Sequence, residues 1–355
     1  MNISFDPDCP VEEAWMPPSA WYRDPNFLDK ETELILSRTW QFVGRAEQVA
    51  NPGDYFTVDL FGESILVCRD EEGRVRGFFN VCRHHAALVG DGSGQAQEFV
   101  CPYHGWCYRL DGTLRKAPKL GPAKNFDRHA FGLTQLHLCE WGPLIGVCIG
   151  DERPPEPEDS WPDIHQVLEA SKWSELVFVE HRSYEVNCNW KVYVDNYLDG
   201  GYHVSVLHPD LAGSLELSSY QTTLGQSSVL QCSTGADDAG RIGERADYGW
   251  VYPNFMLNRY GPVLDTNWVL PLGPEKCLVH FDFFFTKEAI KRREFVSNSL
   301  ESSEKVQQED IWISESVQRG LSSRSYERGR YAPKLEHGEF LFHQLIHRDV
   351  MARGK

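Results

Sequence analysis

The chain has 355 residues and a formal net charge of -17, from 35 Lys and Arg against 52 Asp and Glu. This acidic excess argues against binding to nucleic acid or to an anionic membrane surface, since both need a basic face. It would suit a cationic substrate or a basic redox partner. The length exceeds one ordinary hydrophobic core, so we expect a soluble, globular protein of two domains.

Short β-type segments dominate the stretch from about residue 40 to residue 150. Residues 55–60, 64–68 and 144–149 are separated by Gly and Asp turns, which is typical of a small all-β module. Residues ahead of this stretch, including 29–39, predict helix. The acidic, proline-rich run 151–160 cannot continue a helix or a central strand. We therefore predict an all-β domain at 40–150, inserted into a larger domain formed by 1–39 and 151–355.

Two Cys/His pairs lie inside the predicted β domain. Cys82-x-His84 is followed, after sixteen residues, by Cys101-x-x-His104. This is the ligand spacing of a Rieske [2Fe-2S] cluster, in which two thiolates hold one iron and two imidazoles hold the other. Structural zinc also takes two Cys and two His, but it favours unmixed pairs. His85 competes with His84 as a ligand, and the Cys-x-His spacing favours His84. The motif predicts an electron-transfer domain.

After residue 160 the pattern predicts helices near 165–171, 190–203 and 302–320, with strands between them. His203 and His208 lie at the end of the second helix. Five residues correspond to about 140° around an ideal helix, so the two imidazoles converge only if the helix ends or distorts near them. Pro209 agrees with such an end.

Two imidazoles need a carboxylate to form the facial triad that holds non-haem Fe(II) with positions open for O2. The nearby Asp195, Asp199 and Asp210 compete for this role with the distant Asp310. Asp310 lies on a predicted helix whose apolar stripe of Val306, Ile313 and Val317 would bury one face. Because a redox cluster is predicted upstream, we interpret the histidine pair as iron ligands rather than as structural residues.

The run 248–274 is rich in aromatic and amide side chains. If 248–260 is one strand, alternation separates an aromatic and polar face from an apolar face. Rings with few charges suit a quaternary ammonium group, although aromatic residues in strands more often pack a sheet against helices. From this face and the following strand we predict substrate contacts by Trp250, Tyr252, Asn258, Tyr260 and Trp268.

The segments CPYHGW, DNYLDGGYHV, VYPNFMLNRYGP and ED-x6-VQRGL resemble the α subunit of the Rieske non-haem iron oxygenases. The resemblance extends over essentially the whole chain and is strongest to the choline monooxygenase group. It implies an α+β fold, with the all-β Rieske domain beside a catalytic domain whose central antiparallel sheet is flanked by helices in helix-grip fashion. It also implies a [2Fe-2S] cluster and a mononuclear Fe(II), with these ligands in chain order: Cys82, His84, Cys101, His104, His203, His208 and Asp310.

The same resemblance implies a homotrimer in which a carboxylate connects the cluster of one subunit to the iron of its neighbour. The usual spacing places this acid three residues before the first histidine, where this chain has Gly200. Asp199 lies four residues before, as in the choline monooxygenase-like pattern, and is assigned the bridge. Asp195 is the second candidate.

The implied activity is hydroxylation of a small quaternary ammonium compound, choline to betaine aldehyde, with O2. Electrons would come from a ferredoxin or a flavin/iron-sulfur reductase, since no Gly-x-Gly-x-x-Gly motif follows a strand. Alternatives are C–N cleavage or N-demethylation of carnitine, glycine betaine or stachydrine-like compounds, and oxidation of an aromatic acid. A non-enzymatic alternative is an electron-transfer protein with a vestigial second site.

Further features bear on location or are assigned no role. The N-terminal residues are not typical of a secretory or transit peptide, no run approaches the length of a membrane span, and the cysteines lack a disulfide-like pattern. We therefore expect a cytoplasmic protein. His343 and His347 are interpreted as a surface pair, and four glutamates as solvated helix positions: Glu301, Glu304, Glu309 and Glu315.

Overall fold

The computed structural model describes residues 5–121, 123–236 and 240–352. The chain divides into two compact units, one formed by Ser37–Glu156 and the other by Met1–Leu36 together with Pro157–Lys355. The break between Glu156 and Pro157 falls inside the acidic, proline-rich run 151–160. In the described ranges, no helix is both long and apolar enough to cross a membrane.

The unit Ser37–Glu156 is built from short antiparallel strands, as its alternating sequence predicts. The described strands pair in the orders β1-β10-β9, β4-β3-β2-β5 and β6-β7-β8. Their bounds are Gln41–Arg45 (β1), Asp54–Leu60 (β2), Glu63–Arg69 (β3), Val75–Phe79 (β4), Ser93–Gln95 (β5), Phe99–Val100 (β6), Cys107–Tyr108 (β7), Leu114–Lys116 (β8), His137–Trp141 (β9) and Leu144–Cys148 (β10), with 3-10 turns η2 (Leu36–Arg38), η3 (Ala46–Val49) and η4 (Arg128–Phe131).

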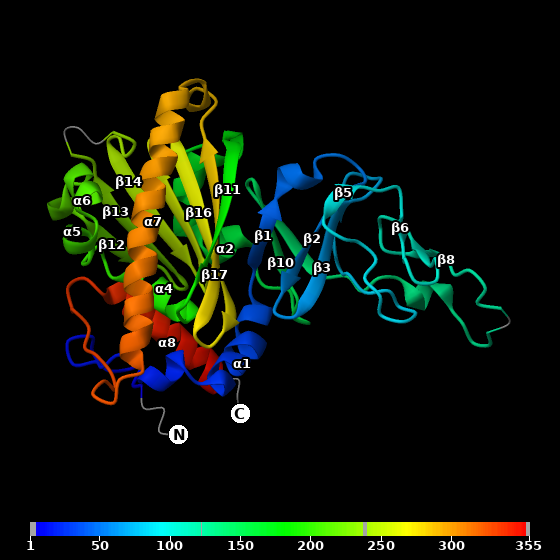
Figure 1. Ribbon diagram of the computed structural model, residues 1–355, viewed down its shortest axis with the longest axis horizontal. Coiled ribbons are helices and arrows are strands. Elements are labelled where there is room, and N and C mark those ends of the chain that lie inside the picture. The colour runs from blue at the N-terminus through cyan, green and yellow to red at the C-terminus, as the bar shows by residue number, and fades with distance from the viewer. Residues whose placement is uncertain (1–4, 122, 237–239, 353–355) are drawn as a thin grey trace. The chain divides into compact units, whose positions relative to one another are not determined.

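Seven of the described strands in the larger unit form one antiparallel sheet, in the order β11-β17-β16-β15-β14-β13-β12 (Figure 1). Neighbours in this order are mostly consecutive in the chain, because hairpins connect them. The strands are Val177–Val186 (β11), Gln221–Leu224 (β12), Ser228–Thr234 (β13), Arg245–Val251 (β14), Phe255–Tyr260 (β15), Val263–Gly273 (β16) and Lys276–Phe285 (β17).

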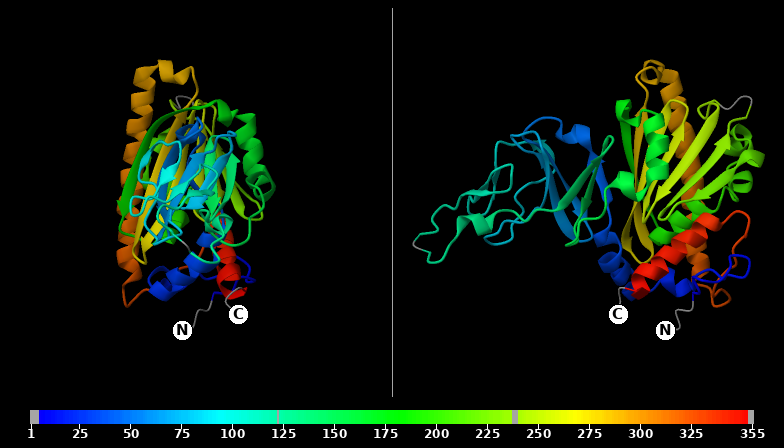
Figure 2. Two further views of the ribbon diagram at one scale, coloured as in Figure 1. Left: turned by 90° about the vertical axis from the view of Figure 1, so that its right-hand side faces the viewer. Right: turned by 180° about the vertical axis from the view of Figure 1, so that it is seen from behind.

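Helices accompany this sheet within the larger unit. Figure 1 shows the long helix α7 lying across the strands, and Figure 2 shows the C-terminal helix α8 beside the N-terminal segment. The helices are Pro25–Leu34 (α1), Pro157–Ser160 (α2), Pro162–Ala170 (α3), Trp190–Leu198 (α4), Val204–Leu207 (α5), Pro209–Ser214 (α6), Arg293–Leu321 (α7) and His337–Ala352 (α8), with 3-10 turns η1 (Ser19–Tyr22), η5 (Trp173–Glu175), η6 (Leu217–Ser219) and η7 (Ala289–Lys291). The predicted α+β fold with a central antiparallel sheet is confirmed.

Helix α7 differs from its prediction in length and in its buried face. It begins at Arg293, well before residue 302, and its predicted apolar stripe is only partly buried: Val306 and Ile313 are half-buried, whereas Val317 is 44% exposed. Polar residues such as Gln307 and Gln318 are buried instead. They accept hydrogen bonds from α4 and its N-terminus: Tyr193 Oη donates to Gln307 over 2.6 Å, and the Asn189 amide donates to Gln318 over 2.8 Å. Polar pairing thus contributes to the contact between these two helices.

The run 248–260 is a hairpin and not one strand. Strand β14 ends at Val251, a turn follows, and β15 begins at Phe255. The predicted face is kept in part, because the register pairs Tyr248 with Asn258 and Trp250 with Met256, whereas Tyr252 and Asn254 fall in the turn. Directly paired residues of antiparallel strands share a face, so Tyr248 and Asn258 are brought together on one face of the sheet.

Candidate active site

The two Cys/His pairs lie on loops with the same backbone hydrogen bonds. In the first loop the Cys82 amide donates to Ala87 O, and the Ala86 amide donates back to Cys82 O. In the second loop the Cys101 amide donates to Trp106 O, and the Gly105 amide donates to Cys101 O. Ala86 and Gly105 occupy equivalent positions, both at positive φ, of 61° and 70°. The two loops therefore share the same backbone turn, although His84 lies two residues after its Cys and His104 lies three residues after its own.

The donor groups of these loops fit a Rieske cluster. Cys82 and Cys101 are buried free thiols, and the His84 and His104 rings lie with their centroids 4.7 Å apart. The Nδ1 atom of His84 is buried and has no hydrogen-bond partner among the described residues, as expected of a nitrogen that would bind a metal. Tyr108 Oη lies 3.3 Å from the Cys82 sulfur, and hydrogen bonds to sulfur help set the potential of such clusters.

The structure distinguishes His84 from its neighbour His85. His84 stacks on the buried Trp106 ring at 4.7 Å, with the two planes 6° apart, whereas His85 is exposed. His85 lies near the exposed ring of Tyr103. The exposed position of His85 therefore favours His84 as the cluster ligand, as the Cys-x-His spacing also does.

The second set of metal-binding side chains begins where α4 ends. Asn189 caps this helix by accepting from the Lys191 amide. The helix ends at Leu198, five residues before His203, so the predicted helix 190–203 was too long. Gly200 and Gly201 follow at φ of 71° and 74°, values that suit glycine. The short helix α5 then separates His203 from His208.

Asp310 on α7 completes this cluster. His203, His208 and Asp310 each offer one ligand atom, and these atoms lie within 4.8 Å of one another. His208 Nε2 is 3.1 Å from Asp310 Oδ1, and Asn196 donates to the same oxygen over 2.7 Å. Two imidazoles and a carboxylate are the donor set of non-haem Fe(II) sites. The structure thus brings together the three residues that were predicted to hold iron.

Each histidine of this cluster also contacts a second carboxylate. His203 Nδ1 lies 2.6 Å from Asp199, and His208 Nδ1 lies 2.7 Å from Glu309. These contacts leave the Nε2 atoms for a metal, an arrangement that fixes ring orientation and raises ligand basicity. Burial lowers the pKa of His208, but Asp310 and Glu309 outweigh it and raise the pKa above its ordinary value. Glu309, predicted to be a solvated helix position, is therefore part of the site.

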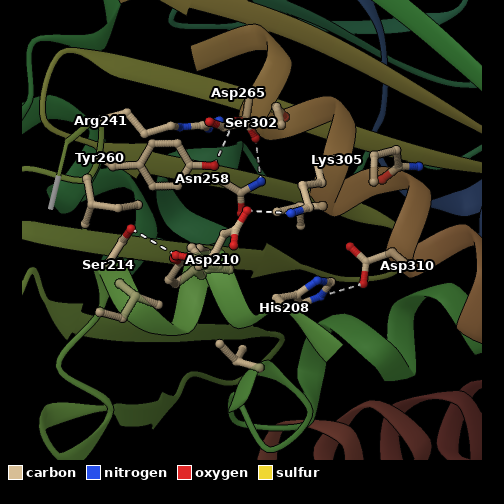
Figure 3. A pocket seen from close by; sticks show the side chains of 18 of the residues that line it. His208, Asp210, Ser214, Arg241, Asn258, Tyr260, Asp265, Ser302, Lys305 and Asp310 are labelled. Carbon is tan, nitrogen blue, oxygen red and sulfur yellow. Dashed lines mark hydrogen bonds and ion pairs between the residues drawn. The ribbon is translucent and has the colours of Figure 1, made fainter. Parts of the chain in front are cut away.

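A cavity of about 750 Å³ adjoins the histidines and Asp310 (Figure 3). Of the predicted substrate residues, it is lined by Asn258 and Tyr260; Trp250, Tyr252 and Trp268 are not among its described lining residues. They are buried elsewhere in the unit. The sequence interpretation missed most of the lining rings, which come from several segments: Tyr193, Tyr197, Tyr220, Tyr248 and Phe281.

Comparisons with known proteins agree with this geometry. The family model of the Rieske [2Fe-2S] domain matches residues 39–127, and that of the ring-hydroxylating alpha subunit catalytic domain matches 173–241 and 216–352. A chloroplastic choline monooxygenase of Arabidopsis thaliana is 42% identical, over 98% of this chain and 85% of that protein. The chain belongs to the Rieske non-haem iron oxygenases.

Other similar proteins include enzymes that are named for carnitine and for naphthalene. The carnitine monooxygenase oxygenase subunit of Escherichia coli K12 is 31% identical, over 94% of each chain. A solved quaternary ammonium Rieske monooxygenase is 27% identical with a TM-score of 0.88, covering 98% of this chain and 100% of that one. A naphthalene 1,2-dioxygenase, at 21% identity and a TM-score of 0.80, shares the fold. The predicted enzyme class and both predicted cofactors are confirmed at the level of the family.

The oxygenase contains a second buried group of polar side chains, around His343. This residue was predicted to lie on the surface, but it is fully buried. Its Nε2 is 2.9 Å from Tyr22 Oη and 3.1 Å from Asp195, and its Nδ1 is 2.7 Å from Tyr331 Oη. Burial and the Asp195 charge raise the pKa of Tyr22, so the phenol stays protonated and donates to Asp195 over 2.8 Å. The Asp195 carboxylate therefore interacts with Tyr22 and His343 rather than with His203.

Glu309 gives a testable expectation for iron binding. Replacing it with alanine removes the partner of His208 Nδ1 and should weaken Fe(II) binding by about 10- to 100-fold, because the ring loses its fixed orientation. The dissociation constant, from Fe(II) titration of the iron-free enzyme, checks this value. Glu304→Ala is the matched control, since Glu304 is on the same helix but pairs with Arg182 and Tyr184. Equal affinities in the two variants would contradict the role of Glu309.

Proposed function

We propose that the oxygenase hydroxylates choline to betaine aldehyde. The observation that supports this best is the cavity beside His203, His208 and Asp310, whose walls include tyrosine rings suited to a quaternary ammonium group. The similarity to choline monooxygenase over nearly the whole chain supports the same choice. A protein partner supplies the electrons, as this family requires.

The proposed ligands follow from the donor sets. Cys82, His84, Cys101 and His104 would hold the cluster, and the other three residues would hold the iron: His203, His208 and Asp310. The cluster supplies electrons one at a time, and the Fe(II) supplies a binding position for O2. Asp199 and Glu309 would keep both iron-binding rings oriented.

The cavity wall would bind and orient the substrate. Tyr220 and Tyr248 are nearly parallel, with their planes 19° apart and ring centroids 6.3 Å apart, and Tyr260 lies 6.0 Å from Tyr248. Contacts of a trimethylammonium group with such rings contribute about 0.5 to 2 kcal/mol each. These rings and the histidines line the same cavity, so a substrate held by its ammonium group would remain beside the proposed iron ligands.

The proposed reaction is balanced by two electrons and two protons. One oxygen atom of O2 enters a carbinol C–H bond of choline, and the other leaves as water. The product carbon then carries two hydroxyl groups, and loss of water from it gives betaine aldehyde. Hydroxylation of an N-methyl carbon would give demethylation instead, so the products identify the attacked carbon.

Asp199 is proposed as the link between this iron site and the cluster of a neighbouring subunit in a homotrimer. An aspartate would not fit at position 200, where the family pattern usually has the acid. The φ of Gly200 is 71°, and a Cβ there would lie 2.3 Å from the Leu335 carbonyl oxygen. Asp199 already contacts the His203 ring and lines a smaller cavity of about 220 Å³. A carboxylate so placed can hydrogen bond to a histidine approaching from another chain.

Carnitine is the second candidate substrate, because the solved quaternary ammonium monooxygenase matches the fold over 98% of this chain. Oxygen uptake by iron-loaded protein with a surrogate reductase separates the candidates. We expect uptake to be stimulated by choline and to yield betaine aldehyde. Stimulation by L-carnitine alone would favour the second candidate, and stimulation by benzoate-type acids alone would contradict both.

A further inference from the structure

One buried ion pair in the cavity wall has no role in the proposed iron site. Arg241 Nη2 lies 3.2 Å from Asp265 Oδ2, and the Asp265 side chain is only 1% exposed. Asp265 also accepts from Asn258 over 2.5 Å and from Tyr260 Oη over 2.8 Å. Figure 3 shows these four side chains gathered in one part of the cavity. Hydrogen bonds thus hold Asp265 against the guanidinium.

Arg241 is shaped to bind an anion but is already neutralised. Its Nη1 donates to Ser299 O over 2.7 Å, its guanidinium lies 4.5 Å from the Tyr260 ring centroid, and its buried Nε has no partner among the described residues. Burial raises the pKa of Asp265, and Arg241 is the group that opposes this most. The guanidinium remains charged, because arginine is not deprotonated in proteins. The pair is therefore neutral only while Asp265 is ionised.

The other Lys and Arg residues of the described cavity lining are exposed to solvent. Arg292 is exposed and stacks on Phe295, and Lys305 is exposed and paired with Asp210. Exposed pairs contribute little to binding, whereas a buried guanidinium can bind a carboxylate strongly. Arg241 is thus the cation best placed to receive a substrate carboxylate, and Asp265 already occupies it.

We propose that Asp265 determines specificity: by neutralising Arg241, it excludes quaternary ammonium compounds that also carry a carboxylate and favours the amino alcohol choline. This inference rests on the proposed function and extends it. A carboxylate entering the cavity meets a guanidinium that Asp265 already neutralises, so no net positive charge offsets the cost of removing the carboxylate from water. The hydroxyl of choline brings no charge and avoids this cost. Disfavouring a competitor by leaving its buried charge without a partner is a common source of specificity.

The test compares Asp265→Asn with the wild-type enzyme on choline and on L-carnitine. Asparagine keeps the size of the side chain but removes its charge, leaving Arg241 with no anionic partner from Asp265. We expect kcat/KM for L-carnitine relative to choline to rise by at least about tenfold, and the dissociation constant of L-carnitine, from calorimetry, to fall in parallel. An unchanged ratio would overturn the proposal.

Two further variants control for indirect effects. The double variant Asp265→Asn/Arg241→Gln should lose the gain, because no cation is left to bind the carboxylate. Asp247→Asn removes an aspartate from a different arginine pair, with Arg245, outside the cavity lining and should leave the ratio unchanged. A gain that persists without Arg241, or that also occurs in Asp247→Asn, would contradict the mechanism.

A wild-type measurement covers the case in which Asp265→Asn does not fold. Carnitine methyl ester lacks the negative charge and should bind at least about tenfold more tightly than L-carnitine. Equal affinities would overturn the role of Asp265 while leaving choline hydroxylation standing. If choline were neither bound nor oxidised, the proposed function itself would fail, and this inference with it.

Discussion

Replacing Asp310 with alanine is expected to reduce choline turnover to the level of enzyme without iron. The substitution removes the carboxylate from the group formed with His203 and His208, and it leaves the Asn196 side chain without its partner. A site with two remaining protein ligands should not retain Fe(II), because affinity depends on ligand number and geometry. Iron content by elemental analysis and product formation on the same preparation measure both effects.

The cluster serves as the internal control for Asp310→Ala. Its proposed ligands lie on loops of the other compact unit, with separate hydrogen bonds and a separate core. The EPR signal of the reduced cluster should therefore persist at wild-type intensity. Full choline turnover in the variant would contradict the assignment of Asp310 as a ligand of the catalytic iron.

Replacing Asp199 with asparagine is expected to slow turnover by about 100-fold. The carboxylate lies 2.6 Å from His203 Nδ1, and the proposed electron path from the neighbouring subunit passes through it. Asparagine keeps the size of the side chain but removes the charge that holds the imidazole proton. Rapid-mixing measurements of cluster reoxidation should show slow electron delivery, and iron analysis should show iron still bound.

Asp195→Asn separates the two candidates for this bridge. Its carboxylate accepts from Tyr22 and lies 3.1 Å from His343, so the variant should leave the rate of cluster reoxidation nearly unchanged. The opposite pattern, slow reoxidation in Asp195→Asn and normal rates in Asp199→Asn, would reverse the assignment.

Most of the proposed metal-binding residues could be predicted from the sequence, because ligands of one metal site lie at short, regular spacings in the chain. Cys82 and His84 lie two residues apart on one loop, and His203 and His208 flank the single helical turn Val204–Leu207. Asp310 is more than a hundred residues away, and only the resemblance singled it out from the local carboxylates. The pairing of α4 with α7 then brings it to the histidines, through contacts such as Asn196 with Asp310.

The cavity was less accessible because its residues come from segments that no local pattern connects. Tyr197 on α4 donates to Asn258 on β15 over 2.8 Å, and Arg241 precedes β14. Trp250 satisfied the same alternation as Tyr260, and Trp268 was predicted from the following strand. Both pack in the interior and are not among the described residues that line the cavity. Glu309 carried one available signal: it is adjacent to Asp310 in the sequence.

The most direct test is a single turnover of the reduced, iron-loaded enzyme with choline and O2 in the absence of any reductase. The account predicts that the cluster is reoxidised and that betaine aldehyde forms in the same reaction, because both redox centres belong to this chain. Reoxidation of the cluster with all choline recovered unchanged, or formaldehyde in place of betaine aldehyde, would contradict it.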